Sequence, residues 1–248
     1  MAMKSKSSSK AAGRRARPRL GRRTKDMPDG RQALLRAATR AFADNGFDAA
    51  DIRSIAAAAG VSPNLVRVHF GSKADLWDAC LEAIVAGVTP TMREISAITR
   101  NTEWSVYERL RRTILRVIAY YEAHPEVHGF IARYGLEAPE RAGLVTERLL
   151  LPAYETNREL FGAGMEAGIL RCRHPALFFA LLNTAVNQAP TFLMLVDRLA
   201  PDIAPVDARR LMTETIIATL LHTPAEPATV HQPADLGASP TSGSSSAR

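Results

Sequence analysis

The sequence contains little cysteine and begins without the pattern of a secretory signal. Only two of its 248 residues are cysteines, Cys80 and Cys172, and they form no CxxC pair. Such usage argues against a disulfide framework and favours a reducing compartment. The basic first residues are not followed by the apolar stretch that a signal requires. We therefore expect a cytoplasmic protein.

Long apolar runs suited to lipid are missing as well. A membrane-spanning helix needs about 20 apolar residues. The charge-free stretch of that length, 175–196, contains Asn183, Asn187 and Gln188 near its middle. Amide side chains are unfavourable inside a bilayer. We therefore expect a buried helix here and no membrane partner.

The motifs of common enzyme classes are also lacking. The sequence contains no G-x-S-x-G, H-E-x-x-H or P-loop pattern. Segment 162–167 fits a G-x-G-x-x-A dinucleotide pattern, but it follows a predicted helix and not a strand, which argues against that site. His124 and His128 have a spacing that can bind metal, but Pro125 separates them and no Cys or carboxylate cluster completes a site. We expect no enzyme, no catalytic residues, no metal and no cofactor.

The positive charge is concentrated at one end. The formal net charge is +7, yet residues 1–29 alone carry ten basic and two acidic side chains. This segment has few large apolar groups, so we expect a disordered arm. It is either a solvated tail or leader, or an arm that neutralises nucleic-acid phosphates. Residues 30–89 balance six basic against six acidic side chains, so they cannot depend on bulk charge.

Between the arm and a Pro/Ala/Ser/Gly-rich tail (222–248), the pattern is helical throughout. Apolar residues recur at helical spacing, and no alternating β-branched run competes. Pro152 predicts a kink or a break inside one helix. The tail lacks periodicity and is expected to be disordered. The predicted helices are 31–44, 52–59, one opening at Pro63, 72–86, 90–100, 104–123, 126–137, 142–166, 175–199 and 206–221.

Three short helices near the start have the features of a helix-turn-helix. Asp51 is a suitable N-cap for the second helix. Gly60 allows a tight turn with positive φ. Ser62 and Pro63 open a third helix, with Ser as cap and Pro at the first helical position. The N-terminal end of such a helix points into the major groove of DNA.

The residues that follow carry a specific resemblance. The segment V-S-P-N-L-V-R-V-H-F-G-S-K-A-D-L (61–76) closely resembles the recognition helix of the tetracycline-repressor (TetR) family, whose pattern is roughly G-V-S-x-x-x-x-Y-x-H-F-x-S-K-x-x-L. The resemblance implies an all-α protein. It would have an N-terminal three-helix helix-turn-helix DNA-binding domain (30–89) and a larger C-terminal helical ligand-binding and dimerisation domain (90–221).

The resemblance also implies a set of DNA contacts. Asn64 would read a base, since Asn suits adenine. Arg67 stands where the family usually has Tyr, and Val68 where it has His or Tyr, so the choice of bases is open. His69 either contacts the backbone or packs as a neutral helix residue, and Arg53 either contacts the backbone or is solvated. The predicted DNA-binding residues are Arg53, Ser62, Asn64, Arg67, His69 and Lys73.

The second half suggests a ligand pocket and a dimer. Aromatic residues at helical spacing either form core or line a pocket for a largely apolar ligand. The amides at 183, 187 and 188 either line that pocket or pair across an interface. By resemblance, 175–199 and 206–221 would form a homodimer interface. The predicted ligand-binding residues are Trp104, Tyr107, Tyr121, Phe130, Tyr134, Asn183 and Asn187.

These features together predict a transcription regulator. Its partners would be a double-stranded DNA operator, an unknown small-molecule effector and a second copy of the chain. A largely apolar ligand would release the dimer, as a repressor, from a palindromic operator. The alternatives are a non-specific architectural DNA-binding protein and a small-molecule carrier.

Overall fold

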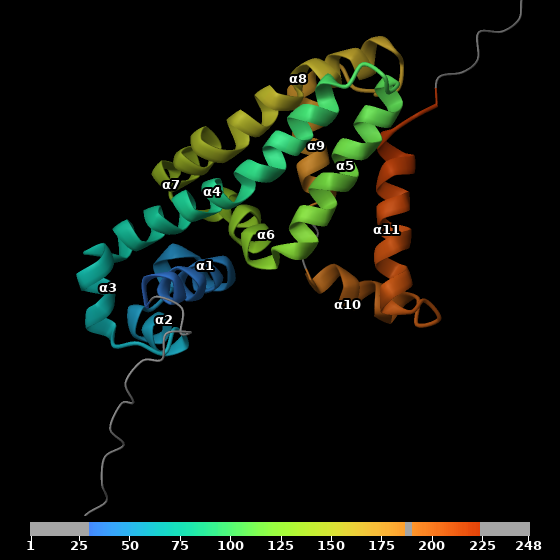
Figure 1. Ribbon diagram of the computed structural model, residues 1–248. Helices are drawn as coiled ribbons and strands as arrows, with labels where there is room; N and C mark the ends of the chain where they lie inside the picture. Colours follow the sequence, from blue (N-terminus) through green and yellow to red (C-terminus); the bar gives the residue numbers. More distant parts are fainter. Residues whose placement is uncertain (1–29, 187–189, 224–248) are drawn as a thin grey trace, which may run out of the picture.

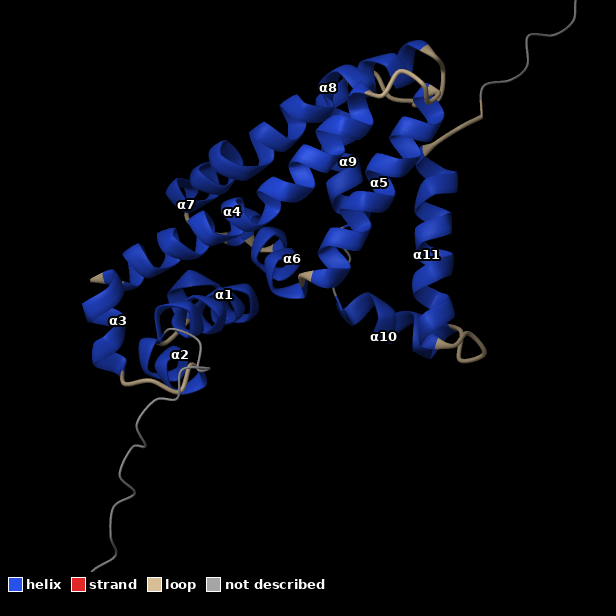
Figure 2. Ribbon diagram, viewed as in Figure 1, coloured by secondary structure: helices blue, strands red, loops and turns tan. Residues whose placement is uncertain are grey.

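The computed structural model describes residues 30–186 and 190–223, and this part of the chain contains helices and no strands (Figures 1 and 2). The predicted arm (1–29), residues 187–189 and the chain from 224 onward lie outside the described residues. His222, placed in the predicted tail, belongs to the folded body, because its N–H donates to the carbonyl of Ile169 at 2.9 Å.

The first three helices have the predicted turns, and the second has its predicted cap. They are α1 (Gly30–Ala49), α2 (Ile52–Ala58) and α3 (Pro63–Phe70). Gly46, with φ of 77°, interrupts α1 where the sequence predicted a stop, and Phe47 packs back onto Phe42 with ring centroids 6.1 Å apart. The Asp51 carboxylate caps α2 by accepting from the Ser54 N–H at 2.9 Å. Gly60 adopts φ of 69° in the turn before α3.

The fourth helix is longer than predicted. Two helices, 72–86 and 90–100, were expected, but α4 runs unbroken over Lys73–Arg100 with Pro90 in its interior. Proline removes one backbone hydrogen bond, and here packing against α1, α5 and α8 offsets that loss. The expected domain boundary at residue 89 therefore lies within a helix, so α4 connects the two parts of the molecule without a linker.

Of the remaining helices, α5 (Val106–Ala123) and α8 (Leu151–Glu166) pack against α4, whereas α11 (Pro205–Leu220) lies on the side of α5 away from α4 (Figure 1). The predicted helix 126–137 ends at residue 132 and is followed by a 3-10 turn. The predicted helix 142–166 is two helices joined by a π-helical turn just before Pro152, which is a common way to accommodate a kink. The predicted helix 175–199 is described as two helices. The elements are α5 (Val106–Ala123), α6 (Pro125–Ala132), η1 (Tyr134–Leu136), α7 (Pro139–Val145), η2 (Thr146–Leu150), α8 (Leu151–Glu166), α9 (Pro175–Val186), α10 (Pro190–Leu199) and α11 (Pro205–Leu220).

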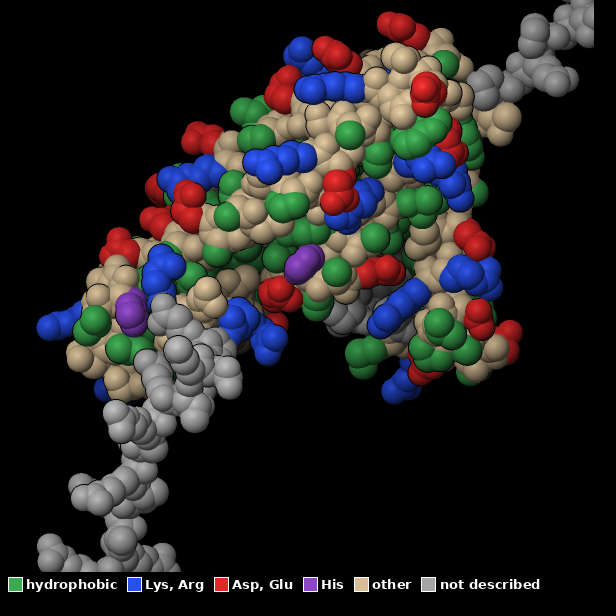
Figure 3. Space-filling view, in the orientation of Figure 1, with side chains coloured by type: hydrophobic (Ala, Val, Ile, Leu, Met, Phe, Trp, Pro, Cys, Tyr) green, Lys and Arg blue, Asp and Glu red, His purple; other side chains and the backbone are tan. Residues whose placement is uncertain are grey.

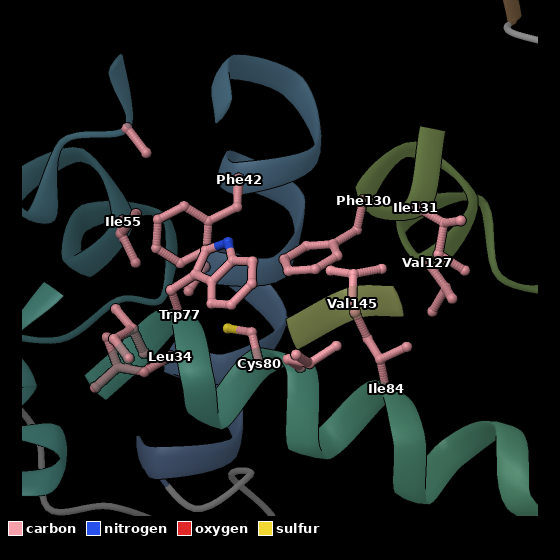
Figure 4. Packing of buried hydrophobic residues seen from close by; sticks show 14 of the residues in the cluster. Leu34, Phe42, Ile55, Trp77, Cys80, Ile84, Val127, Phe130, Ile131 and Val145 are labelled. Atoms are coloured by element: carbon pink, nitrogen blue, oxygen red, sulfur yellow. The ribbon is translucent and has the colours of Figure 1, made fainter. Parts of the chain in front are cut away.

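A single buried cluster joins the first three helices to α4, α6 and α7. Figure 4 shows the Trp77 indole between the rings of Phe42 and Phe130, and the Trp77 and Phe130 centroids are 5.4 Å apart. Burial raises the pKa of the Cys80 thiol in this cluster to about 12, so the thiol stays protonated. The N-terminal helices thus share their core with a segment that begins about 50 residues beyond the end of α3.

A second cluster holds the other end of the molecule together. It combines side chains from α5, α8, α9 and α11, among them Leu110, Phe161, Phe178 and Ile216. The rings of Phe161 and Phe178 meet edge to face at 4.9 Å.

Acidic and basic side chains are interspersed over the face of the molecule that Figure 3 shows. Charge therefore does not mark a site on that face.

Candidate functional site

The third helix presents its N-terminal part to solvent. Val66 is buried against the core, whereas Asn64, Arg67 and Val68 are exposed. The turn before the helix is fixed by the Val61 N–H, which donates to the Ala56 carbonyl at 3.0 Å. Because the buried face is held by α1 and α4, the exposed residues project from a supported surface. This is the arrangement that a groove-reading helix requires.

Ser62 differs from its prediction in one respect. It occupies the N-cap position of α3, but its hydroxyl makes no capping hydrogen bond. Pro63 at the first helical position has no N–H to satisfy, which lowers the need for a cap. The Ser62 side chain is exposed. Ser62 therefore does not cap the helix through its side chain, and its predicted DNA contact stays a prediction.

Val68 is a surface residue that the sequence prediction left without a role. Its side chain is 67% exposed, which is unusual for a large apolar residue in a short, partly buried helix. It follows Asn64 by one helical turn, so the two side chains lie on the same face. An apolar side chain in the major groove can contact the methyl group of thymine. The four-residue spacing from Asn64 was the signal that could have identified it.

Lys73 is held by protein contacts at the start of α4. The Ser72 and Asp75 side chains form the predicted capping box there. The Lys73 Nζ donates to the Asp48 carbonyl at 3.0 Å and lies 4.8 Å from the centroid of the Phe47 ring. An ammonium has three donors, so this bond leaves capacity for a phosphate. The contact also ties α4 to the end of α1.

His69 and Arg53, for which the sequence left two roles open, are both exposed. His69 is exposed, with its ring edge-on to Phe70 at 6.2 Å. Arg53 is exposed on α2 beside Asp51. The backbone N–H of Ser54 lowers the pKa of the Asp51 carboxyl, so this group is charged at neutral pH. A carboxylate at this position would weakly repel a nearby phosphate.

Three charged side chains that follow α6 in the sequence contact the end of α1. We call Arg133, Glu137 and Arg141 the clasp. Arg133 donates to the carbonyls of Asp44 and Asn45 at 3.3 and 3.2 Å, and so satisfies C-terminal carbonyls of the helix. Glu137 accepts the backbone N–H of Phe47 at 3.0 Å. The last turn of α1 is thereby bonded to the segment between α6 and α7.

The clasp reaches Lys73 through one aromatic ring. Arg141 donates to the Glu137 carboxylate at 3.1 Å, and its guanidinium carbon lies 3.7 Å from the centroid of Phe47. The same ring is contacted by Lys73. A short chain of contacts therefore runs from the α6–α7 segment, through Phe47, to the start of α4.

A small cavity lies between α4, α5, α8 and α9. It has a volume of about 70 Å³, and Tyr121 and Asn183 line it as predicted. Burial raises the pKa of the Tyr121 phenol to about 12. Residues that the sequence prediction missed also line it, chief among them Thr113, Tyr120 and Asn157.

Three other predicted ligand residues lie elsewhere. Trp104 packs under the Arg112 guanidinium at 4.1 Å, Tyr107 packs against the second core, and Phe130 packs against Trp77 in the first. These three do not line the cavity, because helical spacing shows that a side chain points inward but not whether it meets core or cavity. The side chain of Tyr134 and the whole of Asn187 and Gln188 lie outside the described residues.

Large apolar side chains of α9, α10 and α11 are exposed, and we call them the apolar surface. Its large side chains are half or more exposed in the single chain, with Leu199 at 75% and Val206 at 74%. Contiguous exposed apolar groups mark interaction sites. The segments are those predicted to form a homodimer. The remaining members of this surface are Leu177, Leu181, Met194 and Leu195.

Two further properties concern only the part of the chain that the structure describes. Among the residues of this part, no group of three or more His, Cys, Asp or Glu side chains is placed to hold a metal ion. None of the described helices combines the length and apolarity needed to cross a membrane.

The sequence similarity to known proteins is strongest in the N-terminal helices. Residues 34–80 match the family model "Bacterial regulatory proteins, tetR family". The chain is 43% identical over 77 residues to the helix-turn-helix-type transcriptional repressor Rv3405c of Mycobacterium tuberculosis, covering 29% of this chain and 40% of the relative. It is 26% identical over 157 residues to the repressor NicS of Pseudomonas putida, covering 62% and 71%. The chain thus spans less than half of the mycobacterial relative.

Solved structures extend the similarity to the whole fold. HlyIIR, a hemolysin II transcriptional regulator, superposes with a TM-score of 0.57 at 16% identity, covering 78% of this chain and 98% of the other. PfmR of Thermus thermophilus superposes with a TM-score of 0.52 at 22% identity, covering 77% and 95%. At these identities the likeness shows the fold alone.

The family match, the relatives and the exposed third helix define a bacterial helix-turn-helix transcription regulator. Residues 34–80 match the DNA-binding helices of the TetR family of bacterial regulatory proteins, and the relatives named above are transcriptional repressors.

Proposed function

We propose that the chain is a homodimeric repressor that binds a palindromic operator and leaves it when a small, largely apolar effector enters the cavity. The observation that carries this proposal is the continuity of α4. Its first residue, Lys73, adjoins the recognition helix, and Thr91 and Ile95, further along the same helix, line the cavity. A displacement of α4 by the effector would therefore move the helix-turn-helix.

The proposed units are a DNA-binding part (30–89) and a ligand-binding and dimerisation part (90–221). Asn64 reads bases, while Arg53, Ser62, Arg67, His69 and Lys73 contact the DNA backbone. The exposure of α3 and the match over residues 34–80 support these roles.

The proposed dimer uses the apolar surface of α9, α10 and α11. A two-fold contact brings the same surface of both copies together. The two recognition helices would then lie about 34 Å apart, one DNA turn, or at a multiple of that spacing. The exposure of Leu199 and Val206 supports this arrangement.

The proposed release is a population shift between a DNA-competent and a DNA-incompetent state. An effector shifts it only by its difference in affinity for the two states. The cavity walls Ile131 and Leu149 flank the clasp segment in sequence, so a second route leads from the effector through the clasp to α1.

Genome-wide footprinting with the purified protein tests the proposal. The expected result is one or a few palindromic sites bound at least about 10³-fold more tightly than random DNA. Uniform binding across the genome would favour the architectural alternative. Absence of DNA binding even at low salt would favour a carrier.

A further inference from the structure

Two buried polar atoms in the cavity lack partners. The Asn157 side chain is 5% exposed and Thr113 is 1% exposed, and both line the cavity. Neither Asn157 Oδ1 nor Thr113 Oγ1 has a hydrogen-bond partner among the described residues. An unsatisfied buried polar atom costs free energy, so native proteins contain few of them, and each one needs an explanation.

The orientation of the Asn157 amide is fixed by its other end. Its Nδ2 donates to the Ala153 carbonyl one turn earlier in α8, at 2.8 Å. A carbonyl cannot accept from an oxygen that has no hydrogen, so this bond assigns Nδ2 to the helix and Oδ1 to the cavity. Asn157 thus offers the cavity an unpaired acceptor.

Thr113 lacks a hydrogen bond that several other helical threonines make. Thr39, Thr146, Thr184 and Thr215 each donate a hydroxyl proton to the carbonyl four residues earlier, at 2.7–3.0 Å. Thr113 lies inside α5 but makes no such bond. Its hydroxyl is therefore available to a group in the cavity, as either donor or acceptor.

The cavity wall carries no formal charge. No Asp, Glu, Lys, Arg or His is among its lining residues. A neighbouring cation, Arg116, is already paired with Glu94 and also donates to the Thr91 hydroxyl at 2.9 Å. Tyr120 and Tyr121 are neutral, because burial raises the pKa of both phenols. A charged ligand would lose its hydration here without gaining a counter-charge.

We propose that the effector of this chain is a neutral, mainly apolar molecule carrying a hydroxyl or N–H that donates to Asn157 Oδ1, with the Thr113 hydroxyl as a second polar partner. This inference rests on the proposed function in taking the cavity as the effector site. The cavity volume of about 70 Å³ is several times the roughly 10–15 Å³ that one water needs, so it admits a compact organic group.

Titration calorimetry of the full chain, without DNA, tests the chemistry with a matched set of compounds. Phenol, anisole and toluene share a ring and differ in the donor, while benzoate and benzylammonium add a charge. Phenol should bind at least about tenfold more tightly than anisole or toluene, because only phenol satisfies the buried acceptor. The two charged compounds should bind more weakly than phenol.

Two variants test whether the preference for phenol depends on the acceptor at Asn157. Asn157→Leu should abolish the preference for phenol over anisole. Asn45→Leu is the matched control, since Asn45 also donates Nδ2 to a carbonyl one turn earlier, at 3.2 Å, but is exposed and is not among the residues that line the cavity. It should keep the preference. Without ligand, Asn157→Leu should melt no lower than the parent chain, whereas an amide needed only for structure would lower the melting temperature.

The outcomes distinguish this inference from the proposed function. Equal binding of phenol, anisole and toluene, or no binding at all, would mean that the two polar atoms serve water only, and the inference would be wrong. An effector that released the operator without any donor preference would overturn the inference but keep the proposed function. Binding that depended on the donor but left the operator affinity unchanged would support the inference and contradict the proposed function.

Discussion

The backbone N–H of Phe47 donates a 3.0 Å hydrogen bond to the carboxylate of Glu137, which lies 90 residues further along the chain. This bond joins the end of the first helix of the DNA-binding part to the segment between α6 and α7. Arg141 braces the same carboxylate and contacts the Phe47 ring. The end of α1 is thus positioned by residues of the proposed ligand-binding part.

Gly46 is expected to be intolerant of a side chain for two reasons. Its φ of 77° strains any L-residue, and an added Cβ would lie 2.9 Å from Arg133 Nε and 3.2 Å from Glu137 Oε1. Gly46→Ala should lower the free energy of unfolding by about 2–3 kcal/mol. Gly60→Ala is the control, since φ there is 69° but nothing lies within 4 Å. It should cost only the backbone strain, about 1 kcal/mol. Urea denaturation measures both, and equal losses would show that the clasp does not crowd Gly46.

Glu137→Ala should loosen the clasp. It leaves the Phe47 N–H and the Arg141 guanidinium without their acceptor, and the expected loss of unfolding free energy is about 1–3 kcal/mol. Glu137→Gln keeps an acceptor for Phe47 and should lose less. If the clasp transmits the effector signal, Glu137→Ala should also reduce the change in operator affinity that effector causes. An unchanged ratio of affinities with and without effector would restrict the clasp to a structural role.

Lys73→Ala should weaken binding to every DNA sequence by a similar factor. A phosphate contact releases one counterion, so the slope of log affinity against log salt should fall by about one unit. Arg100→Ala, at the other end of α4, is the control and should leave the slope unchanged. Fluorescence anisotropy across a salt series gives both slopes. A sequence-dependent loss would instead make Lys73 a base contact.

Asn64→Ala should relax the choice of base at one position in each half-site. A bidentate contact to adenine is worth about 1–3 kcal/mol of discrimination. Val68→Ala, one turn along the same exposed face, should alter preference at a neighbouring position through a lost thymine contact. Binding to a library of randomised half-sites measures both changes. An equal loss of affinity for every sequence in the library would show that Asn64 does not contact a base.

Features set by local chemistry were predictable from the sequence. The Asp51 cap, the capping box of Ser72 and Asp75, and the positive φ of Gly46 and Gly60 each depend on a few neighbouring residues. The recognition-helix motif was likewise local, and the family match over residues 34–80 includes all of it.

Features set by tertiary packing were not predictable. Pro90 argued for a break, but contacts from three helices keep α4 continuous. Phe130 had the spacing of a pocket residue, yet it packs on Trp77. Asn157 gave no signal in the sequence, because its role depends on which helix face meets the cavity. The clasp joins residues about 90 apart, a separation that no periodicity reports.

The ratio of specific to non-specific DNA affinity tests the central claim most directly. The full chain would be titrated at physiological salt onto a duplex carrying its footprinted palindrome and onto a shuffled duplex of the same composition. A regulator should prefer the palindrome by about 10³-fold or more. A ratio below about tenfold would contradict the proposal that this protein recognises a specific operator.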